Sequence, residues 1–287
     1  WKNVSIALFP QNHSKYHVGI DMHKPEGQDL IKKLAARSDI LIENFRAGTL
    51  EEKFGLGYRQ LREINPRLIY VANTGFGQWG PFARGRASYD GLAQAVSGLT
   101  AITGEEGGLP TKIGNYIGDW FGASLSALGA LAALRWRDRT GEGQFVEMAQ
   151  CEGLLRALDW TWLYAGLTGR DRPKTGNRDP VFSPSGVYAC ADGYVALVAG
   201  TDAEFQGLCQ LLGRPELARD PRFESPASRR EKVNAEVLDR LIAAWCEGQT
   251  REQIETLARQ HTVPVAPVMT GKDHYESRHF RFRRSVW

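Results

Sequence analysis

Two short apolar runs decide the fold of this chain: Asp39-Ile-Leu-Ile-Glu43 and Arg67-Leu-Ile-Tyr-Val-Ala-Asn73. Such runs are typical of parallel strands that are covered on both faces. Apolar residues at helical spacing precede the first run, within residues 25–37, and a second helical stretch at 58–64 separates the two runs. The order helix, strand, helix, strand with short links predicts an α/β domain in which helices pack on a parallel sheet.

The same domain continues beyond the second run. A glycine-rich loop follows it, Gly75-Phe-Gly-Gln-Trp-Gly80-Pro81. The pattern then predicts a strand at 144–148 and three helices, at 89–99, 119–137 and 150–163. Residues 166–184 are polar and lack periodicity, which indicates a linker.

The pattern changes after this linker. Two β-prone runs at 187–190 and 194–199 flank Ala191-Asp-Gly193, which predicts a hairpin. Helices are predicted at 204–212, 230–245 and 251–260, followed by a strand at 263–269. The sequence therefore predicts three segments: a large domain at 1–180, a smaller α+β domain at 181–270, and at 271–287 the start of a segment that returns to the large domain.

The composition of the 287 residues is that of a globular protein, with 42% hydrophobic and 24% charged residues. A net charge of only +3 provides no global field for nucleic acid, and no nucleic-acid partner is expected. The four cysteines are widely separated, so we predict no zinc or redox pair and expect reduced thiols in a cytoplasmic protein.

The most apolar stretch, 120–134, is shorter than the about 20 residues that cross a bilayer. We interpret it as a core helix and expect no membrane association. The chain opens at Trp1 without a methionine and stops at Trp287 within a motif-poor stretch. A fragment lacking both ends is therefore expected.

Asp119 begins the predicted long helix, directly after Gly118. One interpretation is structural: the carboxylate caps the helix by accepting backbone N–H bonds. The other is chemical: the helix N-terminus favours a negative charge, so the carboxylate stays ionised and can attack an activated acyl group. The position of Asp119 in the sequence does not choose between them.

An ordered set of motifs covers nearly the whole chain. Its members are Ile42-Glu-Asn-Phe-Arg-Ala-Gly48, Gly55-Leu-Gly-Tyr58, Ile64-Asn-Pro-Arg-Leu-Ile-Tyr70, Gly75-Phe-Gly-Gln78, Tyr89-Asp90, Gln94-Ala95, Ser97-Gly98, Gly118-Asp119, Arg139-Thr-Gly-Glu-Gly-Gln144, Gly176-Asn177, Ser185-Gly-Val-Tyr188, Ala191-Asp-Gly193, Leu212-Gly213, Asp220-Pro-Arg-Phe223 and Val263-Pro-Val-Ala-Pro-Val268. By these motifs the sequence resembles the family III CoA-transferases, the CaiB/BaiF type that includes formyl-CoA and carnitine CoA-transferases. The resemblance implies a Rossmann-like parallel sheet with helices on both faces, a smaller α+β domain, and an interlocked dimer.

The resemblance also implies a reaction. Asp119 would be the nucleophile that attacks the thioester of an acyl-CoA, giving a mixed anhydride and CoA thiolate. The thiolate would return to the aspartyl carbonyl, and a second carboxylic acid would then take CoA through a second anhydride. The implied partners are an acyl-CoA and a small carboxylic acid, with no permanently bound cofactor and no metal. A homodimer, or a heteromer with a related subunit, is expected.

The same resemblance suggests the residues that bind coenzyme A and the acyl group. Candidate CoA contacts are Lys15, Asn44, Phe45, Arg46, Lys53 and Thr74, the last at a position where some members of the family have a lysine just before the glycine loop. Candidate residues of the acyl pocket are Gly75, Phe76, Gly77, Gln78 and Tyr89. The loop that differs from the glycine-rich loop of formyl-CoA transferase, at 176–186, argues against formyl and oxalyl substrates.

Three other functions compete with this interpretation. Racemases of the same family use a histidine where this chain has Tyr89. A nicotinamide-dependent dehydrogenase is suggested by Gly75-x-Gly77-x-x-Gly80, but Pro81 follows instead of an apolar helix. A non-catalytic subunit of a heteromeric transferase is the third, and the retained Asp119 speaks against it.

Overall fold

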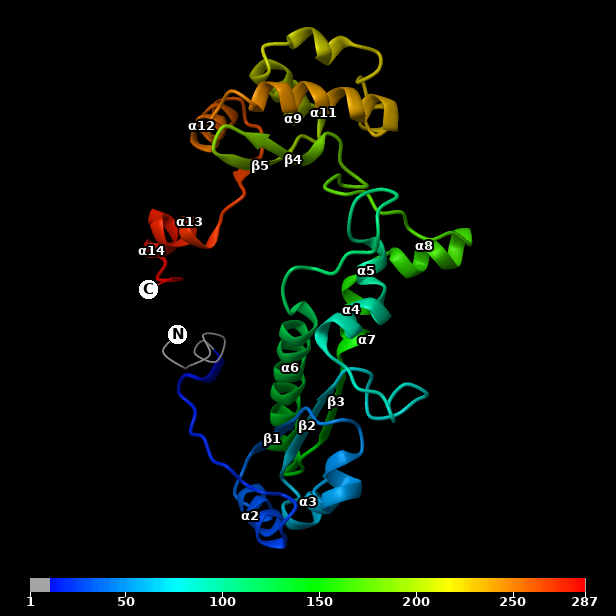
Figure 1. Cartoon of the computed structure of the whole chain (residues 1–287), viewed down its shortest axis with the longest axis vertical. Helices are drawn as coiled ribbons and strands as arrows, with labels where there is room; N and C mark the ends of the chain where they lie inside the picture. Colours follow the sequence, from blue (N-terminus) through cyan, green and yellow to red (C-terminus); the bar gives the residue numbers. More distant parts are fainter. Residues whose placement is uncertain (1–10, 287) are drawn as a thin grey trace. The chain divides into compact units, whose positions relative to one another are not determined.

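The computed structural model describes residues 11–286, and the chain divides into two compact units (Figure 1). The first unit comprises the chain up to Ala101 together with Thr111–Arg172, and the second comprises Ile102–Pro110 and the chain from Pro173 onward. This division and the one predicted at residue 180 both fall within the polar stretch 166–184. No sequence pattern indicates that residues 102–110 join the second unit.

The first unit contains a parallel sheet in the order β1-β2-β3, formed by β1 (Ile40–Glu43), β2 (Ile69–Thr74) and β3 (Phe145–Ala149). Alternate side chains of β2 point to opposite faces, as in any strand. Tyr70 and Ala72 join a core cluster with Leu61 of α3 (Tyr58–Ile64) and Ala35 of α2 (Pro25–Ala35). Ile69 and Val71 pack instead against the helix α6 (Ile117–Thr140). The predicted parallel sheet with helices on both faces is confirmed.

Helix α6 is longer than predicted and is buried along one stripe only. The buried stripe consists mainly of small residues four positions apart: Gly118, Gly122, Ser126 and Ala130, with Ala133 and Arg137 beyond them. Small side chains let the helix lie close to the sheet, whereas Leu128 and Leu131 on the other side are exposed. By length and composition α6 could cross a membrane, and 28% of its apolar window is buried. The prediction of a core helix is therefore wrong in two respects. The helix is long enough to cross a membrane, and it is only partly buried.

The remaining elements of the first unit are short. They are η1 (Thr49–Lys53), α4 (Asp90–Ser97), α7 (Gln150–Ala157) and α8 (Thr161–Thr168), together with α5 (Leu99–Ile102), whose last residue is the first of the second unit. Helix α4 packs against both α6 and α7 through Ala93 and Leu154. This packing brings the starts of α4, α6 and α7 to the edge where the parallel strands end.

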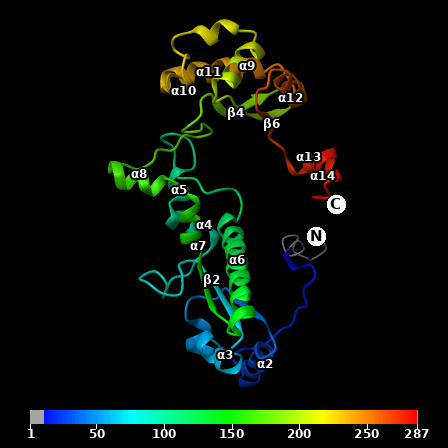
Figure 2. The same cartoon turned by 180° about the vertical axis from the view of Figure 1, so that it is seen from behind.

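The second unit is an antiparallel sheet, β4 (Ser185–Cys190), β5 (Gly193–Val198) and β6 (Val265–Pro267), with helices on it. The predicted hairpin is confirmed, because Cys190 pairs with Gly193. Figures 1 and 2 show α9 (Asp202–Leu211) and α11 (Lys232–Cys246) on one side of the sheet. The other elements are η2 (Pro215–Arg219), α10 (Pro226–Arg229), α12 (Arg251–Gln260), α13 (Gly271–Glu276) and α14 (Arg278–Phe282).

The core of the second unit is apolar and continuous. Leu197, Phe205, Leu208 and Leu238 are among its buried members. Cys209 and Cys246 lie in the same core, and burial raises the pKa of each thiol to about 11. All four cysteines are free thiols, and these two pack as small apolar side chains.

Candidate active site

The carboxyl ends of the three parallel strands open into a cavity of about 280 Å³. In open α/β sheets this edge is the usual place for a ligand. The residues that follow β1, β2 and β3 line it, together with the first residues of α4 and α6. The lining residues are Asn44, Phe45, Arg46, Ala47, Asn73, Thr74, Gly75, Phe76, Gly77, Ala83, Arg86, Ser88, Tyr89, Asp90, Asp119 and Gln150.

Most of the residues predicted from the sequence meet at this cavity. Those that line it are Asn44, Phe45, Arg46, Thr74, Gly75, Phe76, Gly77, Tyr89 and Asp119. The other three do not. Gln78 lines a neighbouring cavity, the ammonium of Lys15 binds the carbonyl of Gln11 at 2.5 Å, and Lys53 ends the short helix η1. Among the polar lining residues, sequence reasoning missed Asn73, Arg86, Ser88, Asp90 and Gln150, and it also missed Ala47 and Ala83.

Asp119 is the third residue of α6 and does not cap it. The residue before the helix is Tyr116, which makes no side-chain capping bond. The cap comes from Asp90, whose Oδ1 accepts the Gly118 N–H at 2.7 Å. The Asp119 Oδ1 instead accepts the amide Nε2 of Gln150 at 2.8 Å. The capping alternative for Asp119 is therefore wrong, and its carboxylate faces the cavity.

The pKa of Asp119 is raised above the ordinary carboxyl value, because burial disfavours the charged form. The hydrogen bond from Gln150 lowers the pKa, and the nearby charge of Asp90 raises it. The direction is opposite to the one that a free helix N-terminus would produce. The reason is that the desolvation of the carboxylate outweighs the hydrogen bond from Gln150, and the charge of Asp90 adds to it in the same direction.

Asp90 and Gln94 hold the start of α6 through hydrogen bonds. Asp90 is 5% exposed and Gln94 is fully buried. The Gln94 Nε2 donates to Asp90 Oδ2 at 2.7 Å, while Gln94 Oε1 accepts the Ile113 N–H at 2.8 Å. Both carboxylate oxygens of Asp90 are thus satisfied by protein N–H groups, and the segment that carries Asp119 is held at both sides.

Close packing requires a glycine at Gly75, the first position of the glycine-rich loop. A Cβ built on Gly75 would lie 2.0 Å from Ser88 Cβ and Oγ, so a side chain cannot be accommodated. The loop is held by Glu147, which accepts the Gln78 N–H at 2.5 Å and the indole N–H of Trp79 at 3.1 Å. After Gly80 the chain forms turns, and the next helix starts only at Asp90. The dehydrogenase alternative therefore lacks the helix that its phosphate site requires.

The cavity also contains polar groups that no protein group satisfies. Within residues 11–286, the buried Thr74 Oγ1 and Asn73 Oδ1 have no hydrogen-bond partner. Thr74 as a whole is only 7% exposed. Unpaired buried polar atoms are rare, because each costs about 1–3 kcal/mol. Their presence beside Asp119 is consistent with a cavity that is completed by a polar ligand.

Comparison with known proteins identifies the family. The model of CoA-transferase family III matches residues 2–287. This chain belongs to that family. One relative is succinyl-CoA–D-citramalate CoA-transferase of Chloroflexus aurantiacus, which is 42% identical over 95% of this chain and 67% of that protein. Another is succinyl-CoA:mesaconate CoA-transferase of Haloarcula hispanica, which is 37% identical over 96% of this chain and 69% of that protein. A crystal structure of a CaiB/BaiF family protein from Brucella suis superposes with a TM-score of 0.81 at 34% identity, covering 92% of this chain and 69% of that one.

In this CoA-transferase a buried carboxyl group orders the segment after β1. Glu43 is 8% exposed, and burial raises its pKa to about 7. Its Oε2 accepts the Phe45 N–H at 2.7 Å, and its Oε1 accepts the side-chain amide of Gln78 at 3.3 Å. Gln78 Oε1 in turn accepts the Gly48 N–H at 3.3 Å. The segment with Asn44, Phe45 and Arg46 is thereby linked to the glycine-rich loop.

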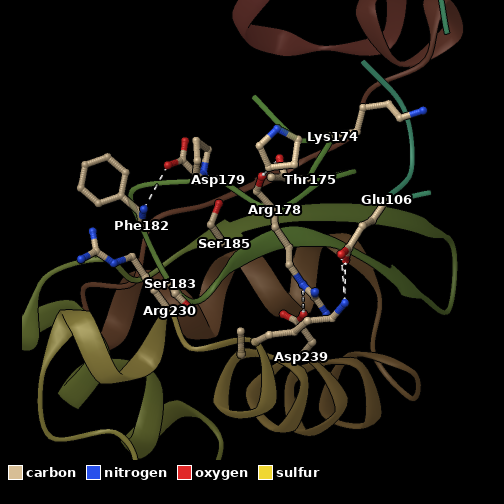
Figure 3. A pocket seen from close by; sticks show the side chains of 14 residues that line it. Glu106, Lys174, Thr175, Arg178, Asp179, Phe182, Ser183, Ser185, Arg230 and Asp239 are labelled. Carbon is tan, nitrogen blue, oxygen red and sulfur yellow. Dashed lines mark hydrogen bonds and ion pairs between the residues drawn. The ribbon is translucent and has the colours of Figure 1, made fainter. Parts of the chain in front are cut away.

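The second unit of the transferase has a cavity of its own, of about 200 Å³ (Figure 3). Four of its seven charged side chains form two ion pairs with each other. Arg178 Nε lies 2.7 Å from Asp239 Oδ2, and Lys232 Nζ lies 2.9 Å from Glu106 Oε1. The hydroxyl of Tyr188, outside the cavity lining, donates to Asp239 Oδ1 at 2.8 Å. The strand-edge cavity described above has no comparable ion pair among its lining residues.

Proposed function

We propose that this CoA-transferase moves CoA between dicarboxylic acids through covalent intermediates on Asp119. The observation that carries the proposal is the placement of the Asp119 carboxylate. It faces the cavity at the strand ends, it is released from capping by Asp90, and one of its oxygens is held by Gln150. The other oxygen remains available to attack a thioester carbonyl. The names of the relatives reported above include succinyl-CoA, which is the thioester of a dicarboxylic acid, and the dicarboxylates citramalate and mesaconate.

In the proposed cycle, every step forms one acyl bond and breaks another. Asp119 attacks the acyl carbon, the C–S bond breaks, and an aspartyl–acyl anhydride and CoA thiolate form. The thiolate attacks the aspartyl carbonyl and releases the first acid as its carboxylate, leaving an aspartyl–CoA thioester. The second carboxylate attacks the aspartyl carbonyl of this thioester, which forms a new aspartyl–acyl anhydride and releases the CoA thiolate. The thiolate then attacks the acyl carbon of the second acid, the C–O bond to Asp119 breaks, and the new acyl-CoA and the free Asp119 carboxylate form. Each step exchanges one activated acyl bond for another, so that no external energy source is consumed.

The CoA moiety is proposed to lie along the segment after β1. Asn44, Phe45 and Arg46 provide an amide, an aromatic face and a guanidinium at the cavity. Thr74 provides a buried hydroxyl that has no partner in the described part of the chain. Cations and N–H groups of this kind suit the phosphates of CoA. The parts proposed for Lys15 and Lys53 rest on the family resemblance alone, since neither lines the cavity.

The absence of histidine at the cavity favours transfer over racemisation. All six histidines lie within the described residues, and none lines the cavity, where Tyr89 stands at the position of the racemase base. We further propose a cytoplasmic enzyme that assembles as a homodimer or with a related subunit. Exposed large apolar side chains on α6, among them Leu128, Leu131 and Trp136, support a surface for such a partner.

Trapping with hydroxylamine tests the proposal. The full-length enzyme is incubated with succinyl-CoA and hydroxylamine, and modified peptides are mapped by mass spectrometry. A hydroxamate at Asp119 is expected, because anhydrides and thioesters of the aspartyl group both react with hydroxylamine. A hydroxamate at another residue, or none during active turnover, would overturn the assignment.

A further inference from the structure

We propose that Arg86 binds the remote carboxylate of the acyl group and thereby selects dicarboxylic over monocarboxylic substrates. The inference rests on the function proposed above and assigns a role to a cation that the proposed chemistry at Asp119 does not use. Arg86 lies in the loop between the glycine-rich loop and α4, and it lines the same cavity as Asp119.

Among the described residues 11–286, Arg86 has no counter-ion. The four charged lining side chains of the cavity are Arg46, Arg86, Asp90 and Asp119. Asp90 is consumed by the Gly118 N–H and by Gln94, and Asp119 is held by Gln150. Neither arginine forms an ion pair within the part of the chain that the structure describes. Two cationic groups are therefore available to anionic ligands.

Arg86 is positioned by aromatic stacking, which keeps its donors free. Its guanidinium carbon lies 4.1 Å from the centre of the Phe82 ring. Phe82 in turn contacts the cavity residue Phe76 edge to face, with ring centres 6.1 Å apart. Stacking on a ring occupies the face of the guanidinium and not its five N–H donors, so that a carboxylate can still be bound in a two-pronged manner.

The two arginines enter the cavity from different elements. Arg46 follows β1 next to Asn44 and Phe45, the segment proposed to hold CoA, whereas Arg86 precedes Tyr89 at the start of α4. An acyl chain that places its thioester carbon at Asp119 leaves its far end for another part of the cavity. A dicarboxylic chain presents a carboxylate there, and a monocarboxylic chain presents a methyl group that leaves the arginine unpaired.

Neighbouring arginines provide a matched experiment. Arg86→Gln removes the proposed contact, whereas Arg84→Gln removes a cation that is paired with Glu52 and lines a different cavity. The values of kcat/KM are measured for succinyl-CoA and butyryl-CoA with one acceptor and full-length enzyme. For Arg86→Gln we expect kcat/KM for succinyl-CoA to fall about 10- to 100-fold, with a change of less than about threefold for butyryl-CoA. Arg84→Gln is expected to leave the ratio of the two donors unchanged.

A second measurement reports on the site without turnover. The inhibition constants of free glutarate and free pentanoate are expected to converge in Arg86→Gln, because only glutarate loses a contact. Equal losses on both donors, with weaker binding of free CoA, would overturn the proposal and assign Arg86 to the CoA phosphates. An unchanged preference would overturn it as well.

Failure of this proposal is distinguishable from failure of the proposed function. If Asp119 is not the nucleophile, hydroxylamine labels another residue while the preference for dicarboxylates still depends on Arg86. If Asp119 is the nucleophile and Arg86 has no part in selection, the label appears at Asp119 and Arg86→Gln keeps the ratio of the wild type.

Discussion

The two units each hold a cavity lined by charged and polar side chains, and the cavities differ in how these groups are satisfied. In the second unit, Arg178 pairs with Asp239 and Lys232 pairs with Glu106. The other two cations of that cavity, Lys174 and Arg230, donate to the backbone carbonyls of Gly108 and Val181. At the strand ends of the first unit, Arg86 has no ion pair and the Thr74 hydroxyl has no partner within residues 11–286. Polar groups that bond to each other are compatible with a stable fold. A buried polar group without a partner destabilises the folded state unless a ligand binds it. The difference indicates which cavity is built for chemistry.

The largest effect that tests this comparison is expected at Asp119. Asp119→Asn keeps the shape of the side chain and an acceptor for Gln150, so the fold and CoA binding should be retained. An amide cannot form the anhydride, so we expect kcat to fall at least about 1000-fold. Steady-state kinetics and calorimetric titration with CoA are the measurements. Near-normal transfer by the variant would show that Asp119 is not the nucleophile and that the strand-edge cavity is not the catalytic site.

A change in the other cavity should affect stability and not catalysis. Asp239→Ala leaves both Arg178 and the Tyr188 hydroxyl without their acceptor. We expect the free energy of unfolding to fall by about 2 kcal/mol, because partly buried groups lose a charge-assisted bond. Urea denaturation gives this value. The kcat/KM ratio between succinyl-CoA and butyryl-CoA should remain that of the wild type, and a changed ratio would argue for a ligand site in the second unit.

Gln150 sharpens the assignment of the strand-edge cavity. Gln150→Met preserves side-chain length but removes the donor to Asp119. We expect kcat to fall about tenfold, because one hydrogen bond to a charged group is lost. Since that bond lowers the pKa of Asp119, its removal raises the pKa, and the acidic limb of the pH–rate profile moves to higher pH. Glu152→Gln, an exposed change on the same helix, should leave the limb in place.

The smallest effect concerns Glu43 and the pH dependence of stability. Its pKa is raised from 4.5 to about 7, so the folded state binds the extra proton and its stability decreases as pH rises between these values. Glu43→Gln stays neutral, so its stability relative to the wild type should improve by about 1 kcal/mol between pH 5 and pH 8, after allowance for partial solvent screening. Thermal unfolding across this range measures it. A difference that is constant with pH would show that the carboxyl group does not titrate there.

Much of the fold follows from local patterns. The runs at 39–43 and 67–73 predict β1 and β2, because a strand covered on both faces has no polar alternation. The predicted helix at 119–137 is α6, although the structure extends it to Ile117 and Thr140. Small residues four positions apart mark its buried stripe in the sequence, but they do not show that the rest of the helix stays exposed. Periodicity within one element reports which side chains share a face, and not what covers that face.

For the candidate site, too, some features follow from the sequence and others only from the tertiary structure. The sequence by itself determined that a carboxylate stands at the start of a long helix, and that a glycine-rich loop follows the second strand. Only the tertiary structure decided that Asp90 caps this helix, that Gln150 holds Asp119, and that Arg86 reaches the cavity while Lys53 does not. The physical reason is that spacing along the chain fixes secondary structure through short-range contacts. The partner of a side chain depends on which distant elements pack beside it.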